Sequence, residues 1–360
     1  MPQIHVLIVN DSLVITHLMK KILAADPQFG PVHWAKDGLE AEQYVRHQQP
    51  DIILMDIHMP RQDGVETTRK ILSQSAIPIL VVTATITKNM SAIYQCLEYG
   101  ALEAIKPPQL SIAQNSSSLS ADQIRTMGKP FLLKVKALAQ LRHKVEQSRQ
   151  SSSLAPNNFQ KRDLRPLAKA QGKASHLVVL GASTGGPKTL QYLLSKFPAD
   201  FSAAVVLVQH MDADFIPSFI EHLSGYCPLP IETALEGVSP QKGRVYVAHE
   251  KKRHLRISSQ QTFCYSSEPE TLHMPSIDVF FASVAEHFGR RAVGALLTGM
   301  GEDGARGLQQ LRKNYGFTIA QDEASSVIYG MPKKAAELDA ADQILGMEEI
   351  SPAIVRHLMD

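Results

Sequence analysis

The sequence predicts two α/β domains, each built on a doubly wound, mostly parallel sheet. Apolar, β-branched runs alternate with amphipathic segments in both halves of the 360-residue chain, which is typical of a parallel sheet covered by helices. Between the halves, residues 148–172 are rich in Ser, Pro, Asn and basic residues and hold too few apolar groups to fold. We therefore expect domains at 1–147 and 173–360, joined by a flexible linker at 148–172.

The first half contains five apolar runs, which we predict as strands: IHVLIV, PVHWA, DIILM, IPILVV and ALEAI. Helix-like segments separate these runs, at residues 13–25, 38–48, 64–73 and 88–99. An insertion at 111–130 follows, and the sequence assigns it no role. Apolar residues then recur at helical spacing over 131–147, which predicts the last helix of this domain.

The second half repeats the alternation of strands and helices. Its predicted buried strands are HLVVL, AAVVLVQ, AVGALLT and FTIAQ. Its predicted helices are PKTLQYLLSKF, SIDVFFASVAEHF, GARGLQQLRKN and a final one that holds His357. Three shorter pieces between them, GRVYVA, HLRIS and TFCYS, are expected to be antiparallel, including a short hairpin.

The overall composition excludes several classes of protein. The formal net charge is +2, so no global field attracts nucleic acid or an anionic membrane. The basic cluster EKKRHLR at 250–256 lies among short strands and is interpreted as a solvated hairpin. The N-terminus has no secretory signal pattern and no apolar run approaches the roughly 20 residues that span a bilayer. We expect a cytoplasmic protein with no nucleic-acid partner and no direct membrane insertion.

Polar residues end four of the five strands predicted in the first half. They are Asn10 with Asp11, Asp56, Thr83 and Lys106. Ligands of open α/β sheets gather at the carboxyl ends of the strands. Carboxylates, an amide oxygen and a backbone carbonyl at that edge suit Mg²⁺, although single polar strand ends are common because loops face water.

This ordered set, together with DGLEA at 37–41 and MDIHMPRQDG at 55–64, resembles the receiver domain of response regulators, which has a flavodoxin-like fold. The resemblance implies that Asp56 is phosphorylated by a histidine kinase. It also implies Mg²⁺ ligands at Asp11, Asp56 and the backbone carbonyl of His58. Thr83 and Lys106 would be the switching pair.

Asn10 departs from the receiver pattern, which has two acidic residues after the first strand. An amide oxygen binds Mg²⁺ only weakly or through water, and the loss of a charge lowers the affinity of the site. We therefore expect weaker metal binding and slower phosphorylation than in a receiver with both acidic residues.

The stretch VVLGASTGGP at 178–187 ends a predicted strand on a glycine-flanked serine, Ser183. Three readings compete: a phosphate-binding loop, a plain tight turn and an exposed nucleophile. A dinucleotide fingerprint or a P-loop requires glycine or lysine at positions that this stretch does not fill. The stretch does fit G-x-S-x-G, the sharp strand-to-helix turn that exposes a serine hydroxyl.

A nucleophilic serine needs a base and a group that orients the base. His210 follows the next strand in VVLVQHM, and Asp303 lies after a later strand in LTGMGEDGARG. Considered alone, His210 is better interpreted as a capping or core histidine, and Asp303 as the N-cap of a helix. Together with Ser183 they form a candidate triad. The order Ser, His, Asp differs from the Ser, Asp, His of α/β-hydrolases, an order that His357 would serve only if it reached the crevice.

Five motifs of the second half, GASTGGP, VQHM, HMPSIDVFFASVA, LTGMGEDGARG and AQDEASSVIYGMP, resemble the chemotaxis response regulator protein-glutamate methylesterases, the CheB family. The resemblance implies that Ser183 is the nucleophile, His210 the base and Asp303 its orienting group. Backbone N–H groups near Thr184, Gly185 and Met300 would shape the oxyanion site.

The resemblance also implies the substrate, the partners and the regulation. Glutamate methyl esters of chemoreceptors would be hydrolysed, and specific glutamines deamidated, with no cofactor for the ester step and Mg²⁺ for receiver phosphorylation by the chemotaxis kinase. In the family, the unphosphorylated receiver covers the esterase crevice. Two alternatives stay open: a response regulator whose hydrolase acts on another ester or amide, and a non-catalytic scaffold that binds receptor or kinase.

Overall fold

The computed structural model describes residues 3–84, 90–108, 121–142 and 172–359. The chain forms two compact units, Met1–Asn157 and Asn158–Asp360, which are described separately. The predicted linker at 148–172 lies outside the described residues except for its last residue, so its boundaries stay predictions. Among the described residues, none of the helices combines the length and apolar character that crossing a bilayer requires.

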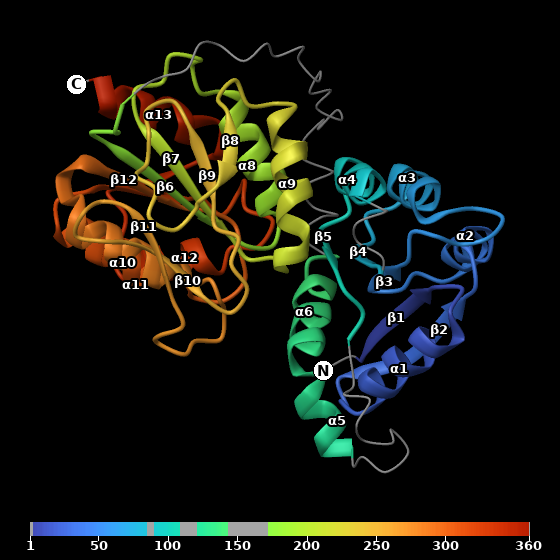
Figure 1. The fold of residues 1–360 in the computed structure, drawn as a ribbon. Helices are drawn as coiled ribbons and strands as arrows, with labels where there is room; N and C mark the ends of the chain where they lie inside the picture. Colours follow the sequence, from blue (N-terminus) through green and yellow to red (C-terminus); the bar gives the residue numbers. More distant parts are fainter. Residues whose placement is uncertain (1–2, 85–89, 109–120, 143–171, 360) are drawn as a thin grey trace. The chain divides into compact units, whose positions relative to one another are not determined.

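The N-terminal unit has a five-stranded sheet in the order β2-β1-β3-β4-β5, with every neighbouring pair parallel (Figure 1). Its strands are β1 (Ile4–Val9), β2 (Phe29–Ala35), β3 (Ile52–Met55), β4 (Ile79–Val82) and β5 (Glu103–Ile105). The order is that of the flavodoxin-like fold, as predicted. β3 and β4 are buried along their whole length, as strands covered by helices on both faces must be.

The helices of this unit are α1 (Leu13–Ala24), α2 (Gly38–His47), α3 (Gly64–Gln74), α4 (Met90–Glu98), α5 (Ala121–Met127) and α6 (Lys129–Ala139). Ser12, Asp37 and Asp63 are N-caps whose side chains accept a backbone N–H of the first turn. Helix α5 lies in the second half of the insertion at 111–130, for which the sequence predicted no structure and no role. Residues 111–120 and the predicted helix end at 143–147 lie outside the described residues.

The C-terminal unit has a seven-stranded sheet in the order β14-β13-β12-β6-β7-β9-β8. Its strands are β6 (Leu177–Ala182), β7 (Ala204–Gln209), β8 (Ile231–Thr233), β9 (Val245–Val247), β12 (Ala292–Leu296), β13 (Phe317–Gln321) and β14 (Gln343–Leu345). A separate antiparallel pair is formed by β10 (His254–Ile257) and β11 (Phe263–Ser266), which confirms the predicted hairpin. The antiparallel prediction for GRVYVA is wrong: β9 pairs parallel with β7 and β8, because its three residues are all buried as a middle strand.

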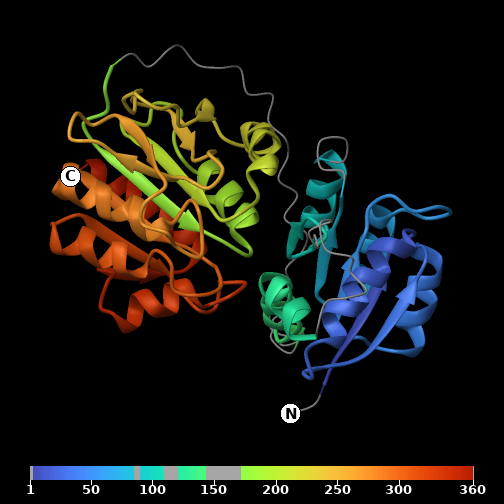
Figure 2. The ribbon, with the colours of Figure 1, turned by 60° about the horizontal axis from the view of Figure 1, so that its bottom comes forward.

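Two helical layers cover the sheet of the C-terminal unit, with α8, α9 and α13 on one face and α10, α11 and α12 on the other (Figures 1 and 2). The helices are α8 (Gly186–Ser195), α9 (Ile216–Ser224), α10 (Ile277–His287), α11 (Ala305–Lys313), α12 (Met331–Glu337) and α13 (Met347–Met359), with 3₁₀ turns at Ala213–Phe215 and Gly289–Arg291. Helices α9 and α12 were not predicted.

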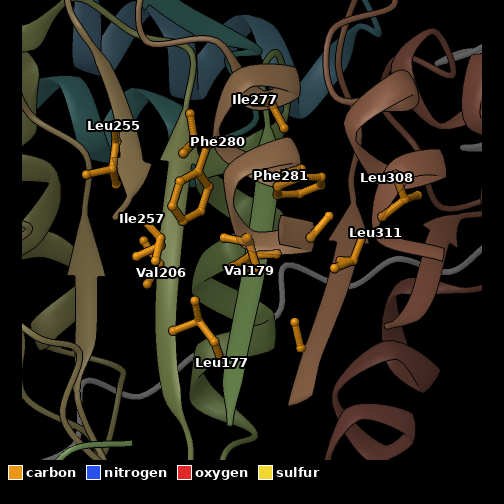
Figure 3. Packing of buried hydrophobic residues seen from close by; sticks show 14 of the residues in the cluster. Leu177, Val179, Val206, Leu255, Ile257, Ile277, Phe280, Phe281, Leu308 and Leu311 are labelled. Carbon is orange, nitrogen blue, oxygen red and sulfur yellow. The ribbon is translucent and has the colours of Figure 1, made fainter. Parts of the chain in front are cut away.

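Alternate residues of each strand point to opposite layers, and one layer forms a cluster of buried hydrophobic residues with α10. Phe280 and Phe281 of α10 face Val179 of β6 and Val206 of β7 (Figure 3). All four side chains are at most about 1 % exposed. This packing fixes α10 across the sheet and so sets where its N-terminus lies relative to the ends of the strands.

Candidate active site

Ser183, His210 and the loop that carries Asp303 all follow the carboxyl ends of neighbouring parallel strands. Ser183 comes directly after β6, His210 after β7, and the loop with Asp303 after β12. These strands are adjacent, in the order β12-β6-β7 (Figure 1). The structure therefore brings together three segments that lie up to 120 residues apart, at the edge where α/β proteins bind ligands.

The turn after β6 requires two glycines for different reasons. Gly185 has a φ of 80°, in the left-handed region, and is the N-cap of α8. Gly186 has no room for a side chain, since an added Cβ would lie 2.0 Å from Oε1 of Gln209. Pro187 then occupies the first turn of α8, where its missing N–H costs nothing. The predicted strand–turn–helix setting of Ser183 is confirmed, but its predicted exposure is wrong, because the residue is only 5 % exposed.

His210 is held beside this turn by main-chain and side-chain bonds. Its N–H donates to the carbonyl of Ala182, the residue before Ser183 (2.9 Å). The side-chain amide of Gln209 donates to the carbonyls of Ser183 (2.8 Å) and His210 (3.1 Å). Ala182 and Gln209 are paired in the sheet. Ser183 and His210 are therefore the next residues on two neighbouring strands that lie about 4.8 Å apart.

The imidazole of His210 is 7 % exposed, and its Nε2 lies 2.8 Å from Oδ2 of Asp303. An ionised carboxylate can only accept, so Nε2 carries the hydrogen of the neutral ring. Nδ1 is buried and has no hydrogen-bond partner among the described residues. A buried acceptor without a partner is costly, and here it belongs to the residue whose N–H is bonded to Ala182, directly before Ser183.

The carboxylate of Asp303 caps the N-terminus of α10. It accepts the N–H of Ile277 (2.7 Å), the N–H of Asp278 (3.0 Å) and the hydroxyl of Ser276 (2.7 Å). Burial alone would raise the pKa of Asp303, but the hydrogen bond and charge of His210 and the bonds from Ser276 and Ile277 outweigh it and lower the pKa to about 2. Asp303 is thus held ionised.

Sequence reasoning missed Ser276, Gln209 and Thr298 as supports of the site. Thr298, fully buried after β12, donates its hydroxyl to the carbonyl of Thr184 (2.9 Å), and its own carbonyl accepts the N–H of Ser183 (3.0 Å). A serine as the first residue of a predicted helix was a usable N-cap signal for Ser276. No local pattern points to Gln209 or Thr298, because their partners lie on other strands.

Three residues were predicted to line an oxyanion site: Thr184, Gly185 and Met300. The N–H of Ser183 is used by Thr298 and so is not available to a ligand. In the part of the chain that the structure describes, the N–H groups of Gly185 and Met300 donate no hydrogen bond. Gly185 begins α8, and helix N-termini favour negative charge. The role of all three residues stays a prediction.

His357 lies at the opposite end of the sheet. Its ring stacks on Phe317, with centroids 4.3 Å apart, and Phe317 is the first residue of β13. The amino ends of the strands are remote from the turn at Ser183, so the order Ser, Asp, His is excluded.

The N-terminal unit gathers its predicted residues in the same way. Asn10 and Asp11 follow β1, Asp56 follows β3, Thr83 follows β4 and Lys106 follows β5, and these strands are consecutive in the sheet. The N–H of Thr83 donates to the carbonyl of Ile105 (3.1 Å), which places Thr83 next to the strand end that carries Lys106.

The charges around Asp56 fit a divalent cation. Burial raises the pKa of Asp56 to about 6, and the negative charge of Asp11 raises it further. The hydrogen bond from the N–H of Ile57 acts in the opposite direction and lowers the pKa. Two close carboxylates without a cation between them repel each other. Among the described residues, no three His, Cys, Asp or Glu side chains surround a common point, so the carbonyl of His58 and Asn10 would have to complete the ligand set.

Asn10 is nearly completely buried, and its Oδ1 already accepts the N–H of Ser12 (2.8 Å). The carbonyl of Asn10 accepts the indole N–H of Trp34 (2.9 Å). The amide oxygen therefore serves the turn into α1, and only one of its lone pairs is left for a ligand.

Comparison with known proteins identifies both units. The sequence profile described as CheB methylesterase matches residues 178–354, and the profile of the response regulator receiver domain matches residues 6–111. The chain is 40% identical over 350 residues to protein-glutamate methylesterase/protein-glutamine glutaminase 1 of Cupriavidus pinatubonensis, covering 97% of this chain and 96% of that protein. The chain belongs to the CheB methylesterase family.

Two further relatives extend this comparison. Protein-glutamate methylesterase/protein-glutamine glutaminase 3 of Pseudomonas aeruginosa is 39% identical to this family member over 348 residues, covering 96% of this chain and 97% of that protein. The crystal structure of the Thermotoga maritima CheB methylesterase catalytic domain is 31% identical, with a TM-score of 0.49, and covers 52% of this chain and 98% of that one.

The low pKa of Asp303 predicts how the stability of this CheB family member depends on pH. A carboxylate whose pKa is lowered by folding stabilises the protein above about pH 4, and this stabilisation is lost as the pH falls towards 2. The difference in unfolding free energy between wild type and Asp303→Asn should therefore be roughly 2 kcal/mol larger at pH 6 than at pH 2. Urea unfolding at both pH values measures it.

The matched control is Asp200→Asn, which removes an exposed carboxylate of the same unit. A wild-type to Asp303→Asn difference that does not change between the two pH values would contradict the bonding scheme at Asp303.

Proposed function

We propose that this protein hydrolyses glutamate methyl esters on chemoreceptors and deamidates specific receptor glutamines, as the names of its relatives describe. The observation that carries the proposal is the state of His210. One ring nitrogen is bonded to Asp303 at 2.8 Å and the other is buried without a partner, on a residue whose main-chain N–H is bonded to the carbonyl of Ala182, directly before Ser183. Acyl transfer to a serine needs a base that is oriented by a carboxylate and keeps a nitrogen free to accept a proton, and His210 meets both conditions.

In the proposed mechanism, Oγ of Ser183 attacks the ester carbonyl while Nδ1 of His210 takes the hydroxyl proton. Asp303 stabilises the resulting imidazolium through Nε2–H. The proton then passes from Nδ1 to the departing methoxide oxygen, and methanol leaves an acyl-enzyme on Ser183. Water attacks the acyl carbon while its proton goes to Nδ1. The bond between the acyl carbon and Oγ then breaks, and Nδ1 returns that proton to Oγ of Ser183 as the glutamate product leaves.

The developing oxyanion needs donors that are not already used in the fold. We assign this role to the N–H groups of Gly185 and Met300, with Thr184 between Ser183 and Gly185 shaping the turn. The same steps deamidate a glutamine, with ammonia in place of methanol. Nucleophile, base and orienting carboxylate all come from the chain, so we propose no cofactor for this chemistry.

The receiver is proposed to control the esterase through phosphorylation of Asp56 by a histidine kinase. Asp11, Asp56 and the carbonyl of His58 would hold Mg²⁺, with Asn10 as a weak or water-mediated ligand. When bound, the cation neutralises charge on the phosphoryl oxygens. Asp56 accepts the phosphoryl group, and Thr83 and Lys106 respond to its oxygens, which would shift the equilibrium between receiver conformations.

Ser183→Ala should abolish methanol release from membranes that carry methylated receptor. Losing the nucleophile of a triad costs on the order of 10⁶ in turnover, which places the variant at background. Methanol is measured with and without a small phosphodonor, which should activate the wild type. The control is Ser175→Ala, at an exposed serine of the same unit. Appreciable methanol release by Ser183→Ala would overturn the assignment, and faster hydrolysis of generic esters than of receptor would point to another substrate.

Asn10→Asp should tighten Mg²⁺ binding by at least about tenfold, since a full charge near 4 Å is worth several kcal/mol at an effective dielectric constant of about 20. The carboxylate can still accept the N–H of Ser12, so the turn is preserved. Trp34, the single tryptophan of the chain, contacts the carbonyl of Asn10 and reports binding by its fluorescence.

Asp11→Asn is the opposite control and should weaken Mg²⁺ binding. An unchanged Mg²⁺ affinity in Asn10→Asp would show that the residue at position 10 does not limit the site.

A further inference from the structure

The ring of His273 is stacked on the ring of His210. The two centroids are 4.2 Å apart and the planes are 15° from parallel. His273 lies in the segment between β11 and α10 and is partly buried. One face of the His210 imidazole is therefore covered by a second aromatic ring, and the roles proposed above make no use of this contact.

A single hydrogen bond leaves the orientation of an imidazole incompletely fixed. The Nε2 of His210 is bonded to Asp303 at 2.8 Å, but the torsion that turns the ring about its bond to Cβ has a broad minimum. Rocking about the Asp303 contact would move Nδ1 relative to Ser183. A flat ring at stacking distance restricts this motion because it can be displaced only together with the segment that carries it.

The segment that carries His273 is anchored at both ends to one buried residue of β10. His254 is fully buried, and its Nδ1 accepts the N–H of Ser276 (3.0 Å). Its Nε2 therefore carries the hydrogen and donates to the carbonyl of Pro269 (2.8 Å). Between these anchors, the hydroxyl of Thr271 donates to the carbonyl of His273 (2.6 Å). His273 is thus held on a short, braced loop.

The stacked ring also suits the charge that His210 acquires during turnover. When Nδ1 takes the proton of Ser183, the ring becomes a cation in a site where it is 7 % exposed. The π-face of an aromatic neighbour stabilises such a cation and keeps water from it. The hydrogen bond to Asp303 holds the edge of the His210 ring, and the stacking contact with His273 covers its face.

We propose that His273 is a positioning residue that holds the plane of the His210 ring so that Nδ1 faces Ser183. The inference rests on the roles proposed for Ser183 and His210. The inference predicts that the chemical step needs a flat ring at position 273. It does not require the side chain at this position to contact the receptor.

The test measures activation of Ser183 without receptor. A small sulfonyl fluoride such as phenylmethanesulfonyl fluoride reacts with the serine: the Oγ–S bond forms, fluoride leaves and the proton passes to His210. Labelling of full-length protein is followed by mass spectrometry of the Ser183 peptide. His273→Ala should slow labelling about tenfold, and His273→Phe, which keeps a flat ring, should stay within about threefold of wild type. Leu272→Ala, at the neighbouring 84 % exposed side chain, should label at the wild-type rate.

Methanol release from receptor supplies the second readout. His273→Ala should lower kcat with little change in KM, and His273→Phe should restore kcat. Wild-type labelling in His273→Ala would overturn the inference, as would labelling of His273→Phe as slow as that of His273→Ala. A raised KM with unchanged kcat would assign His273 to substrate binding instead. Failure of wild-type protein to label at Ser183 would overturn the proposed function itself, and the inference with it.

Discussion

The site depends on one carboxylate that performs two tasks, because Asp303 bonds Nε2 of His210 and also caps the N-terminus of α10 through Ile277, Asp278 and Ser276. The capping is reciprocal. Asp278, in the first turn of α10, accepts the N–H of Gly307 in the first turn of α11 (2.7 Å). Asp303, in the loop before α11, thus satisfies N–H groups of the first turn of α10, and Asp278 of α10 satisfies one of α11, where helices have unpaired donors. The position of the imidazole is therefore linked to the way in which α10 and α11 pack on the sheet.

The arrangement also explains which ring nitrogen acts. Because Asp303 fixes Nε2, the free lone pair is on Nδ1, nearer the main chain of His210. That main chain is bonded to Ala182, so the proposed base and the proposed nucleophile follow adjacent strands of one sheet. Gln209 and Thr298 donate to the carbonyls of Ser183 and Thr184, respectively, so that the turn is held from both neighbouring strands. Rigid strands, more than loops, set the geometry, as precise sites require.

Much of this could be predicted from the sequence, because its signals are local. The glycine-flanked serine after an apolar run, and polar residues at the ends of strands, are readable without knowledge of tertiary contacts. They placed Ser183, His210 and Asp303 after the carboxyl ends of parallel strands, whereas the adjacency of these strands came from the structure. The contact of Ser276 with Asp303 could not be predicted, since it joins residues 27 positions apart through the packing of α10 on α11. The direction of β9 likewise depends on its burial between β7 and β8. Helices α9 and α12 are short, and the only local signal was a proline in the first turn of each. His273 gave no signal of its own, because stacking on His210 is a tertiary event.

The central claim is that the neutral ring of His210 carries its hydrogen on Nε2 and leaves Nδ1 free to accept the proton of Ser183. The most direct measurement is ¹⁵N NMR of full-length protein with labelled histidine, at a pH where the ring is neutral, with His210 assigned by comparison with His210→Ala. The account predicts a protonated, pyrrole-type Nε2 and an unprotonated, pyridine-type Nδ1. A His210 ring with its hydrogen on Nδ1 and a bare Nε2 would contradict the account, because neither the bond to Asp303 nor the transfer from Ser183 could then occur as described.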